Sequence, residues 1–294
     1  MLRGSGAVMR WWVLVTLVGC KVSDEAPDTL NDPMITSFDS IRAGDDALAP
    51  ALRALEEQIY RNVQVDAKDT VARSIAPGPL SAEDVADLQD HPDGDPADCL
   101  AIAVAWPSPF EIDRHAALPL LEDQRPLEPS SPDFFDRQFL GGQDCWEGRG
   151  CVWLNTFQDL TKEYGIVPPI TYQFFKDFRW IDLNAGTGEP ERWAYVAQSW
   201  NPGVYRSEKG DNALLQSYTL ELWLPRDGGG FRWDGDPPEK DQGDSSGGGT
   251  LRFLTLWSEN EMALTDDEET IIGTIRWGMD RNFKAHDAWL EEHP

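Results

Sequence analysis

The second half of the chain is a succession of strand-like segments with no helices between them. After Val152, runs with apolar residues at every second position follow one another up to Trp257, and loops rich in glycine and proline connect them. The expected strands are Val152–Phe157, Ile170–Phe175, Phe178–Leu183, Trp193–Trp200, Ser217–Leu224 and Leu251–Trp257. Because parallel strands need long crossover connections, usually helices, this order predicts an antiparallel sheet.

A further strand is expected earlier in the chain, at Leu100–Trp106. Larger apolar residues alternate there with Ala101, Ala103 and Ala105, so one face of the strand carries only small side chains. Such a face indicates that another element packs closely against it. Between this strand and Val152 the pattern is mixed, and helical pieces are expected at 114–121 and 133–140.

The C-terminal segment is typical of one long amphipathic helix. Thr265 and Glu268 have the spacing of a capping box, and the acidic residues beside them suit the positive end of the helix dipole. The apolar face repeats at intervals of three and four residues, at Ile272, Ile275, Met279, Phe283, His286 and Leu290. A helix of about 25 residues, close to 40 Å long, is therefore expected.

One strand, then helices, then a run of antiparallel strands and a long terminal helix is the element order of the helix-grip fold. Over roughly residues 95–292 the chain resembles the superfamily of START domains and polyketide cyclases in this order, without a diagnostic motif. The resemblance implies an α+β domain over 99–294, with an antiparallel sheet of about six to seven strands packed on the C-terminal helix. In that superfamily the curved sheet and the helix enclose a cavity for an apolar ligand.

The resemblance also implies which residues would line such a cavity. They are aromatic positions of the sheet and apolar positions of the terminal helix: Tyr172, Phe174, Trp180, Tyr195, Tyr218, Trp257, Ile275, Met279 and Phe283. The alternative is a solid core, because aromatic residues on a buried sheet face fill space more often than they line a pocket. His286, on the same helix face, is interpreted as a packing residue.

The first twenty residues have the layout of an export signal. Two arginines precede the apolar run Trp11–Val18, which has about half the length of a membrane-spanning helix. The run ends in the tetrapeptide LVGC, which resembles the lipobox of bacterial lipoproteins. The resemblance implies a signal peptide at 1–19, fatty acyl chains such as palmitate on Cys20, and anchoring in the cell envelope, facing the periplasm or the exterior. The alternative is an ordinary cleaved signal with an incidental cysteine.

Two segments separate this expected anchor from the α+β domain. Residues 20–40 are polar and rich in Asp, Ser and Pro, which predicts a flexible tether after the lipidated cysteine. Residues 41–98 are expected to form an N-terminal helical extension. Its first helix is indicated by helical spacing at Leu48, Leu52, Leu55 and Ile59, and a short second one by Ser81 with Asp84 three residues later.

The chain is strongly acidic. It has 25 Lys and Arg against 52 Asp and Glu, a formal net charge of −27 at pH 7. This balance excludes nucleic acid as a partner, because neutralising phosphates requires clustered lysine and arginine. It also repels anionic lipid headgroups, so acyl chains on Cys20 would have to hold the protein at a membrane.

Three cysteines remain after Cys20. Glycines precede and separate Cys145 and Cys151 in the segment GGQDCWEGRGC, so the backbone can bring this pair together as a disulfide. Cys99 is then left unpaired or bonded elsewhere. Zinc is the competing use of cysteines, but the sequence has no CxxC and no histidine at ligand spacing.

No catalytic motif defines an enzyme in this sequence. A Walker loop is absent, and GDSSGGGT at 243–250 lacks the histidine context of a serine protease. We expect a protein without catalytic residues, metal or cofactor that binds an apolar small molecule. The alternative is a module for carbohydrate or protein contact without an internal cavity, in which Trp146, Trp193 and Trp233 stack on sugar rings.

Overall fold

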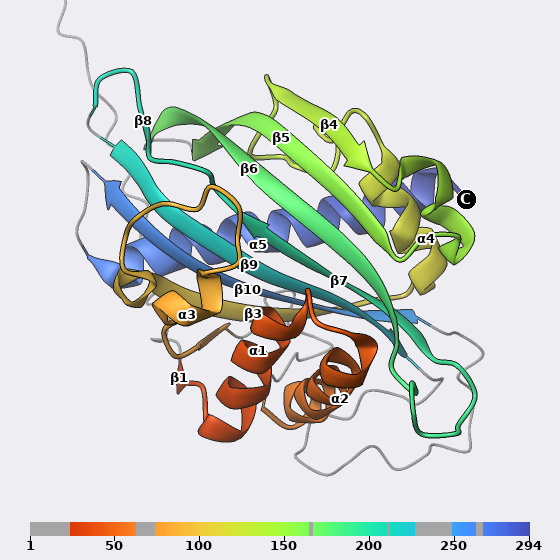
Figure 1. Cartoon of the computed structure of the whole chain (residues 1–294). Helices are drawn as coiled ribbons and strands as arrows, with labels where there is room; N and C mark the ends of the chain where they lie inside the picture. The colour runs from red at the N-terminus through yellow and green to blue at the C-terminus, as the bar shows by residue number, and fades with distance from the viewer. Residues whose placement is uncertain (1–23, 63–73, 165–166, 211, 227–248, 263–266) are drawn as a thin grey trace, which may run out of the picture.

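The strands of the protein form one large sheet that lies between two layers of helices (Figure 1). The computed structural model describes residues 24–62, 74–164, 167–210, 212–226, 249–262 and 267–294. The sheet order is β1-β2-β3-β10-β9-β7-β6-β5-β4, with β8 paired to β9. The strands are β1 Asp24–Glu25, β2 Ser74–Ala76, β3 Leu100–Ser108, β4 Phe135–Gly141, β5 Trp153–Tyr164, β6 Val167–Asp182, β7 Trp193–Trp200, β8 Tyr205–Arg206, β9 Asn212–Arg226 and β10 Gly249–Met262.

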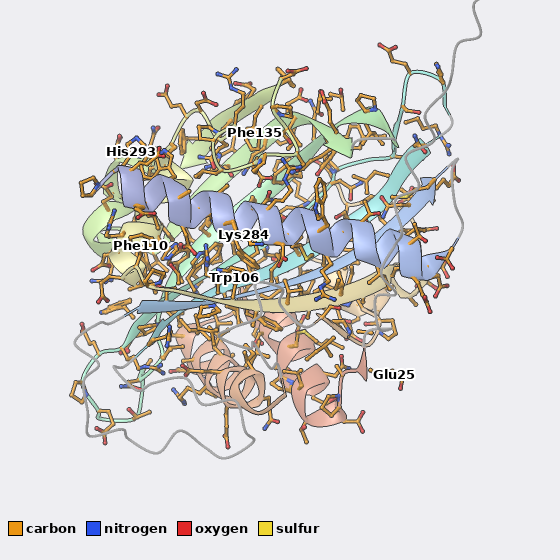
Figure 2. The ribbon with its side chains drawn as sticks, turned by 180° about the vertical axis from the view of Figure 1, so that it is seen from behind. Glu25, Trp106, Phe110, Phe135, Lys284 and His293 are labelled. Carbon is orange, nitrogen blue, oxygen red and sulfur yellow. A yellow bond between two sulfur atoms is a disulfide. The ribbon has the colours of Figure 1, made fainter. Side chains whose placement is uncertain are left out.

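Helices cover both faces of the sheet. The helices are α1 Asp28–Ser40, α2 Asp45–Asn62, α3 Ala82–Val85, α4 Ile112–Ala117 and α5 Glu268–Glu292. α1 and α2 lie on one side, and α5 crosses the other side (Figures 1 and 2). Of the described helices, none is both long and apolar enough to cross a lipid bilayer.

The strand order confirms the predicted α+β class. All described pairings are antiparallel except that of β1 with β2, and β3 joins the far side of β10, so the first long strand lies beside the last. α5 has 25 residues, the length expected. This arrangement of an antiparallel sheet around one C-terminal helix is that of the helix-grip fold, to which an N-terminal helical part is added.

Three expected segments differ from the structure. Ile170–Phe175 and Phe178–Leu183, the latter up to Asp182, form the single strand β6. They are continuous because the polar residues between them have partners: Lys176 pairs with Glu221, and Asp177 with Arg42. The helical piece expected at 133–140 is the edge strand β4. Its side chains alternate between half-buried and exposed positions, a period of two that the charged residues obscured.

The small face of β3 packs against the N-terminal helices, as its alanines predicted. Ala103 and Ala105 belong to one hydrophobic core with the buried residues of α1 and α2. On the opposite face of the same strand, Ile102 and Val104 pack with Met279 and Phe283 of α5. β3 is therefore buried on both faces.

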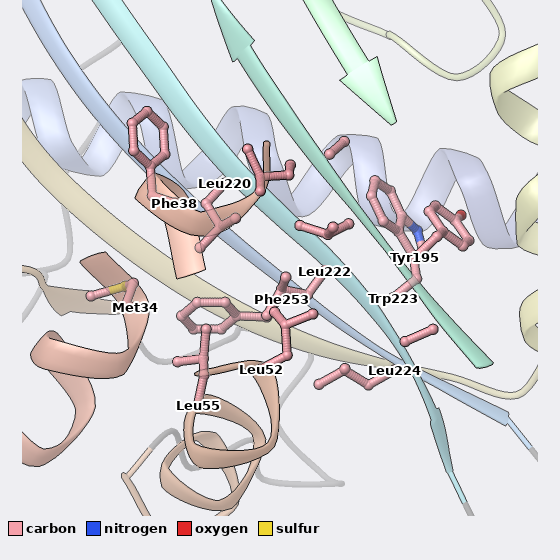
Figure 3. Packing of buried hydrophobic residues seen from close by; sticks show 14 of the residues in the cluster. Met34, Phe38, Leu52, Leu55, Tyr195, Leu220, Leu222, Trp223, Leu224 and Phe253 are labelled. Carbon is pink, nitrogen blue, oxygen red and sulfur yellow. The ribbon is translucent and has the colours of Figure 1, made fainter. Parts of the chain in front are cut away.

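Residues 28–40, expected within a flexible tether, form helix α1 instead. Leu30, Met34 and Phe38 recur every four residues and are fully buried against the sheet. Figure 3 shows Phe38 beside Leu220 of β9. The aspartates that suggested a tether, Asp28, Asp32 and Asp39, lie on the exposed face of this helix. The spacing of the apolar residues was the signal that predicts the helix.

Arginines of the sheet hold the N-terminal helices in place. Arg179 of β6 donates to the carbonyl oxygens of Ile41 and Ala43, just after α1, and to Asp45 at 2.5 Å, where α2 begins. Arg192 forms a two-pronged ion pair with Glu56 of α2 at 2.7 and 2.5 Å. A bidentate pair of this kind fixes the orientation of the two side chains as well as the distance between them.

The helix starts were predicted in part. Ser81 and Asp84 form the expected capping box at α3. α5 begins at Glu268, and its cap is Asp267, which accepts from the Thr270 amide at 2.9 Å. Thr265, the expected cap, lies outside the described residues. Asp267 sits directly before the first helical turn, where an acidic cap also suits the helix dipole.

Phe38→Ala should lower the free energy of unfolding by about 3–5 kcal/mol, the usual cost of truncating a fully buried phenylalanine. The ring is 0% exposed and contacts Tyr218 and Trp257. Urea unfolding followed by circular dichroism measures the change. Phe134→Ala is the matched control, because that ring is 42% exposed and its loss should cost about 0.5 kcal/mol or less. Equal, small effects of the two variants would mean that α1 does not pack on the sheet.

Candidate functional site

The space between the sheet and α5 contains two adjoining hollows. The larger compartment has a volume of about 200 Å³ and is bounded mainly by β5, β6, β9, β10 and the middle of α5. The smaller compartment has a volume of about 90 Å³, lies further along α5 towards the C-terminus, and is closed by the segment 118–127. Together they approach the lower end of the roughly 300–1,000 Å³ found for small-molecule sites.

The two compartments share one wall. Seven residues line both of them: Glu128, Phe174, Lys176, Glu221, Leu254, Met279 and Asn282. Phe174, Leu254 and Met279 make this wall apolar, and the other four carry charge or amide groups. A molecule that extends from one compartment to the other would therefore pass both kinds of surface.

The charged side chains of the shared wall are paired. Lys176 Nζ lies 2.5 Å from Glu221, and Lys162 Nζ lies 2.6 Å from Glu128. Asn282 also donates to Glu128, at 2.7 Å. Burial acts to raise the pKa of Glu128, but the charge and the hydrogen bond of Lys162, together with the charge of Lys176, outweigh it, so the pKa of this carboxyl is lowered and it stays ionised. These residues form a belt of ion pairs across the hollow, here called the polar belt: Glu128, Lys162, Lys176, Glu221 and Asn282.

The smaller compartment carries further polar groups on its walls. Tyr195 of β7 and Trp223 of β9 stack with their ring centroids 4.3 Å apart, and Tyr195 Oη and Trp223 Nε1 are buried without a hydrogen-bond partner. Burial raises the pKa of Tyr195 well above its usual value, so its hydroxyl stays protonated. Arg137 of β4 also lines this compartment.

His286 of α5 belongs to the same wall. Burial, and next the charge of Arg252, lower the pKa of His286 to about 3, so its imidazole is neutral at pH 7. Its Nδ1 is buried without a partner. The sequence interpretation of this residue as packing alone leaves out its position at the edge of a hollow.

Six of the nine predicted lining residues bound one compartment or the other. Tyr172, Phe174, Ile275 and Met279 line the larger compartment, and Tyr195 and Phe283 line the smaller one. Trp180 is on the same face of the sheet but is covered: its ring stacks on Trp146 at 5.2 Å, and its indole donates to the Trp146 carbonyl at 3.1 Å.

Tyr218 and Trp257 were wrongly placed in the cavity by the sequence prediction. Both point to the opposite face of the sheet, where they contact Phe38 of α1 at centroid distances of 6.5 and 5.5 Å. The reason is the register of the strands. Tyr195 pairs with Trp223, so both side chains point towards α5. Glu221, two residues before Trp223, points the same way, and Tyr218, at an alternate position of β9, points away. Because helices cover both faces of this sheet, both faces are apolar, and alternation alone did not show which one meets α5.

Sequence reasoning missed the charged members of the site. Lys176 and Glu221 occupy inward positions of strands that are otherwise apolar, and Lys162 and Arg137 do the same nearer the sheet edge. A charged residue at an inward position of a strand was the available signal. Their partners could not be inferred, because each pair joins strands or loops far apart in the chain.

The cysteine loop agrees with expectation. Cys145 and Cys151 form a disulfide, with Cα atoms 5.2 Å apart. Cys99 is a free, buried thiol, and burial raises its pKa to about 12. The loop also carries Trp146, which is fully buried and donates to the carbonyl of Ala116 at 2.9 Å. Trp146 is therefore part of the core and offers no face for a sugar ring.

Of the other two tryptophans suggested for sugar contact, the structure describes Trp193. Trp193 is half-buried, with the Arg149 guanidinium 5.6 Å from its ring centroid. Trp233 lies outside the described residues. An exposed tryptophan does occur on α5, Trp277, and Arg281 lies 4.5 Å from its ring centroid.

Comparison with known proteins gives similarities of structure only. No family model and no curated protein match this sequence. The STAR-related lipid transfer protein of Xanthomonas axonopodis matches with a TM-score of 0.42 and 10% identity, over 78% of this chain and 98% of that one. TTHA0849 from Thermus thermophilus gives 0.36 and 11%, over 65% and 97%. Ara h 8.0201 gives 0.32 and 14%, over 66% and 99%.

The position of His286 predicts a loss of stability in acid. From pH 6.5 down to about 3 the unfolded chain binds a proton at this histidine that the folded chain does not, so stability falls as pH falls. The slope is at most about 1.4 kcal/mol per pH unit. Urea unfolding at several pH values should give a flatter profile for His286→Leu. Met279→Leu alters the same wall without removing a titrating group and should keep the steeper slope; identical slopes in the two variants would contradict the assignment.

Proposed function

We propose that the protein is a lipid-anchored component of the bacterial envelope that holds an apolar small molecule between its sheet and α5. The observation that supports this is the larger compartment. A single water molecule needs only about 10–15 Å³ of such space. A hollow of about 200 Å³ with Tyr172, Phe174, Ile275 and Met279 in its walls exceeds that many times over.

The walls match an apolar guest. Ile275 and Met279 of α5 and Leu254 and Leu256 of β10 pack in one hydrophobic cluster and line the hollow. Apolar walls with a few placed polar groups are typical of small-molecule sites, in which the apolar surface supplies affinity and the polar groups fix orientation. The polar belt supplies those groups at one end of the larger compartment.

The proposed anchor would hold the fold close to the membrane. The sequence places the acylated cysteine at position 20, and β1 begins at Asp24 and pairs with β2 of the sheet. Four residues of fully extended chain span at most about 14 Å. The helix α1 therefore replaces the expected 20-residue tether, and the cavity would lie near the bilayer that supplies apolar molecules.

Ile275→Trp should block the larger compartment and reduce binding of an apolar probe at least tenfold. The larger ring would occupy the space that Ile275 lines on α5. The fluorescent probe N-phenyl-1-naphthylamine, titrated into the full chain with Cys20→Ser, measures the affinity. Ala288→Trp introduces the same ring at an exposed position of the same helix and should leave the affinity unchanged. Equal binding by both variants would place the probe elsewhere and overturn the cavity proposal.

Cys20→Ser should release the protein from membranes. The acyl chains need the cysteine sulfur and the processed amino group, and two or three chains hold a protein far more firmly than one. Cell fractionation followed by an alkaline wash measures the share in the membrane pellet. Cys99→Ala removes another thiol, one that the structure buries, and should leave the protein in the pellet. Retention of the Cys20→Ser protein after the wash would contradict lipid anchoring.

A further inference from the structure

The residues that line the two compartments carry one more positive than negative charge. The cations are Arg137, Lys162 and Lys176, and the carboxylates are Glu128 and Glu221. Each carboxylate is already engaged by a lysine, at 2.6 and 2.5 Å. Arg137 is left as the surplus charge, in a protein whose formal net charge is −27.

Arg137 makes no ion pair within the described part of the chain. Its Nη1 donates to the carbonyl oxygen of Pro119 at 2.5 Å, its guanidinium lies 5.8 Å from the ring centroid of Phe135, and its Nε is buried without a partner. Burial lowers the pKa of Arg137 to about 9, which leaves it a cation at pH 7. Buried charges are normally paired, because removing an ion from water is costly.

The same compartment has more unpartnered donors than acceptors. Trp223 Nε1 and Arg137 Nε can only donate, and Tyr195 Oη and His286 Nδ1 are able to donate as well. Asn282 Oδ1 is the one unpartnered acceptor among the described residues of this wall. A group that fits such a site is rich in acceptor atoms. An ionised carboxylate accepts only, through two oxygens, and the planar guanidinium matches it in a two-pronged pair.

We propose that the ligand is an amphipathic carboxylic acid, whose carboxylate lies beside Arg137 in the smaller compartment and whose apolar tail extends into the larger one. The inference rests on the proposed function. The tail would pass Phe174 and Met279, which line both compartments. Glu128 and Glu221 do not repel the headgroup strongly, because each is neutralised by its lysine. Tyr195 and Trp223 supply hydrogen bonds after small shifts of their side chains.

The test compares two probes that differ only in the headgroup. Decanoate and 1-decanol are titrated into the full chain with Cys20→Ser, and tryptophan fluorescence or calorimetry gives the affinities. Decanoate should bind at least tenfold more tightly than decanol. Arg137→Gln should weaken decanoate binding about tenfold and change decanol binding less than twofold, and Arg137→Lys should retain part of the preference. Arg206→Gln, at an exposed arginine outside both compartments, should change neither.

A second variant tests the hydroxyl without altering charge. Tyr195→Phe removes an oxygen that has no partner in the structure, so the unfolding midpoint without ligand should stay the same or rise. Decanoate binding should fall three- to tenfold and decanol binding should not change. A lowered midpoint would show that the hydroxyl already has an internal partner, and this would contradict its role in binding.

The outcomes separate this inference from the proposed function. Equal affinity for decanoate and decanol, unchanged by Arg137→Gln, would overturn the carboxylate site and leave the apolar cavity intact. A parallel loss of both probes in Arg137→Gln would make Arg137 a structural residue and overturn the inference as well. Binding of neither probe by the parent chain would overturn the proposed function itself.

Discussion

The structure depends on burial of both faces of one wide sheet. β3, β10, β9, β7, β6 and β5 lie side by side, and at about 4.8 Å between neighbours they span about 24 Å. One α-helix with its side chains is about 10–12 Å across. The two helices α1 and α2 can fill one face, whereas α5 alone cannot fill the other. The hollow beneath α5 therefore follows from the mismatch in width between one helix and this sheet.

The two faces of the sheet are buried in different ways. On the α1 and α2 side the contacts are close and apolar, with alanines of β3 under the helices and Phe38 between Tyr218 and Trp257. On the α5 side the segment 118–127 and the buried aromatic cluster around Trp146 close one end of the gap. The two hollows of the candidate site both lie on the α5 side of the sheet.

What the sequence predicted well was local. The period of two in the strands, the 25-residue helix and the disulfide each depend on residues that are neighbours in the chain, and these predictions agree with the structure. The poorer predictions concern which layer of helices each face of the sheet contacts. Tyr218 and Trp257 were placed on the wrong side because both sides are apolar. Helix α1 was missed because its many polar residues outweighed three buried apolar ones. The polar belt was missed because its pairs join residues 34 and 45 positions apart in the chain.

The polar belt is costly to keep for stability alone. Replacing a buried ion pair by apolar residues of similar volume is often neutral or stabilising by about 1–4 kcal/mol, because the charges no longer have to be removed from water. The pairs Lys162–Glu128 and Lys176–Glu221 lie where such residues could have closed the gap beneath α5. Instead, the belt keeps polar groups between two hollows, and the side chains around it leave donors without partners. This wall combines unfilled space with buried charges, and both lower stability. A core that served stability alone would have no need of them, whereas a site that binds a guest molecule needs both.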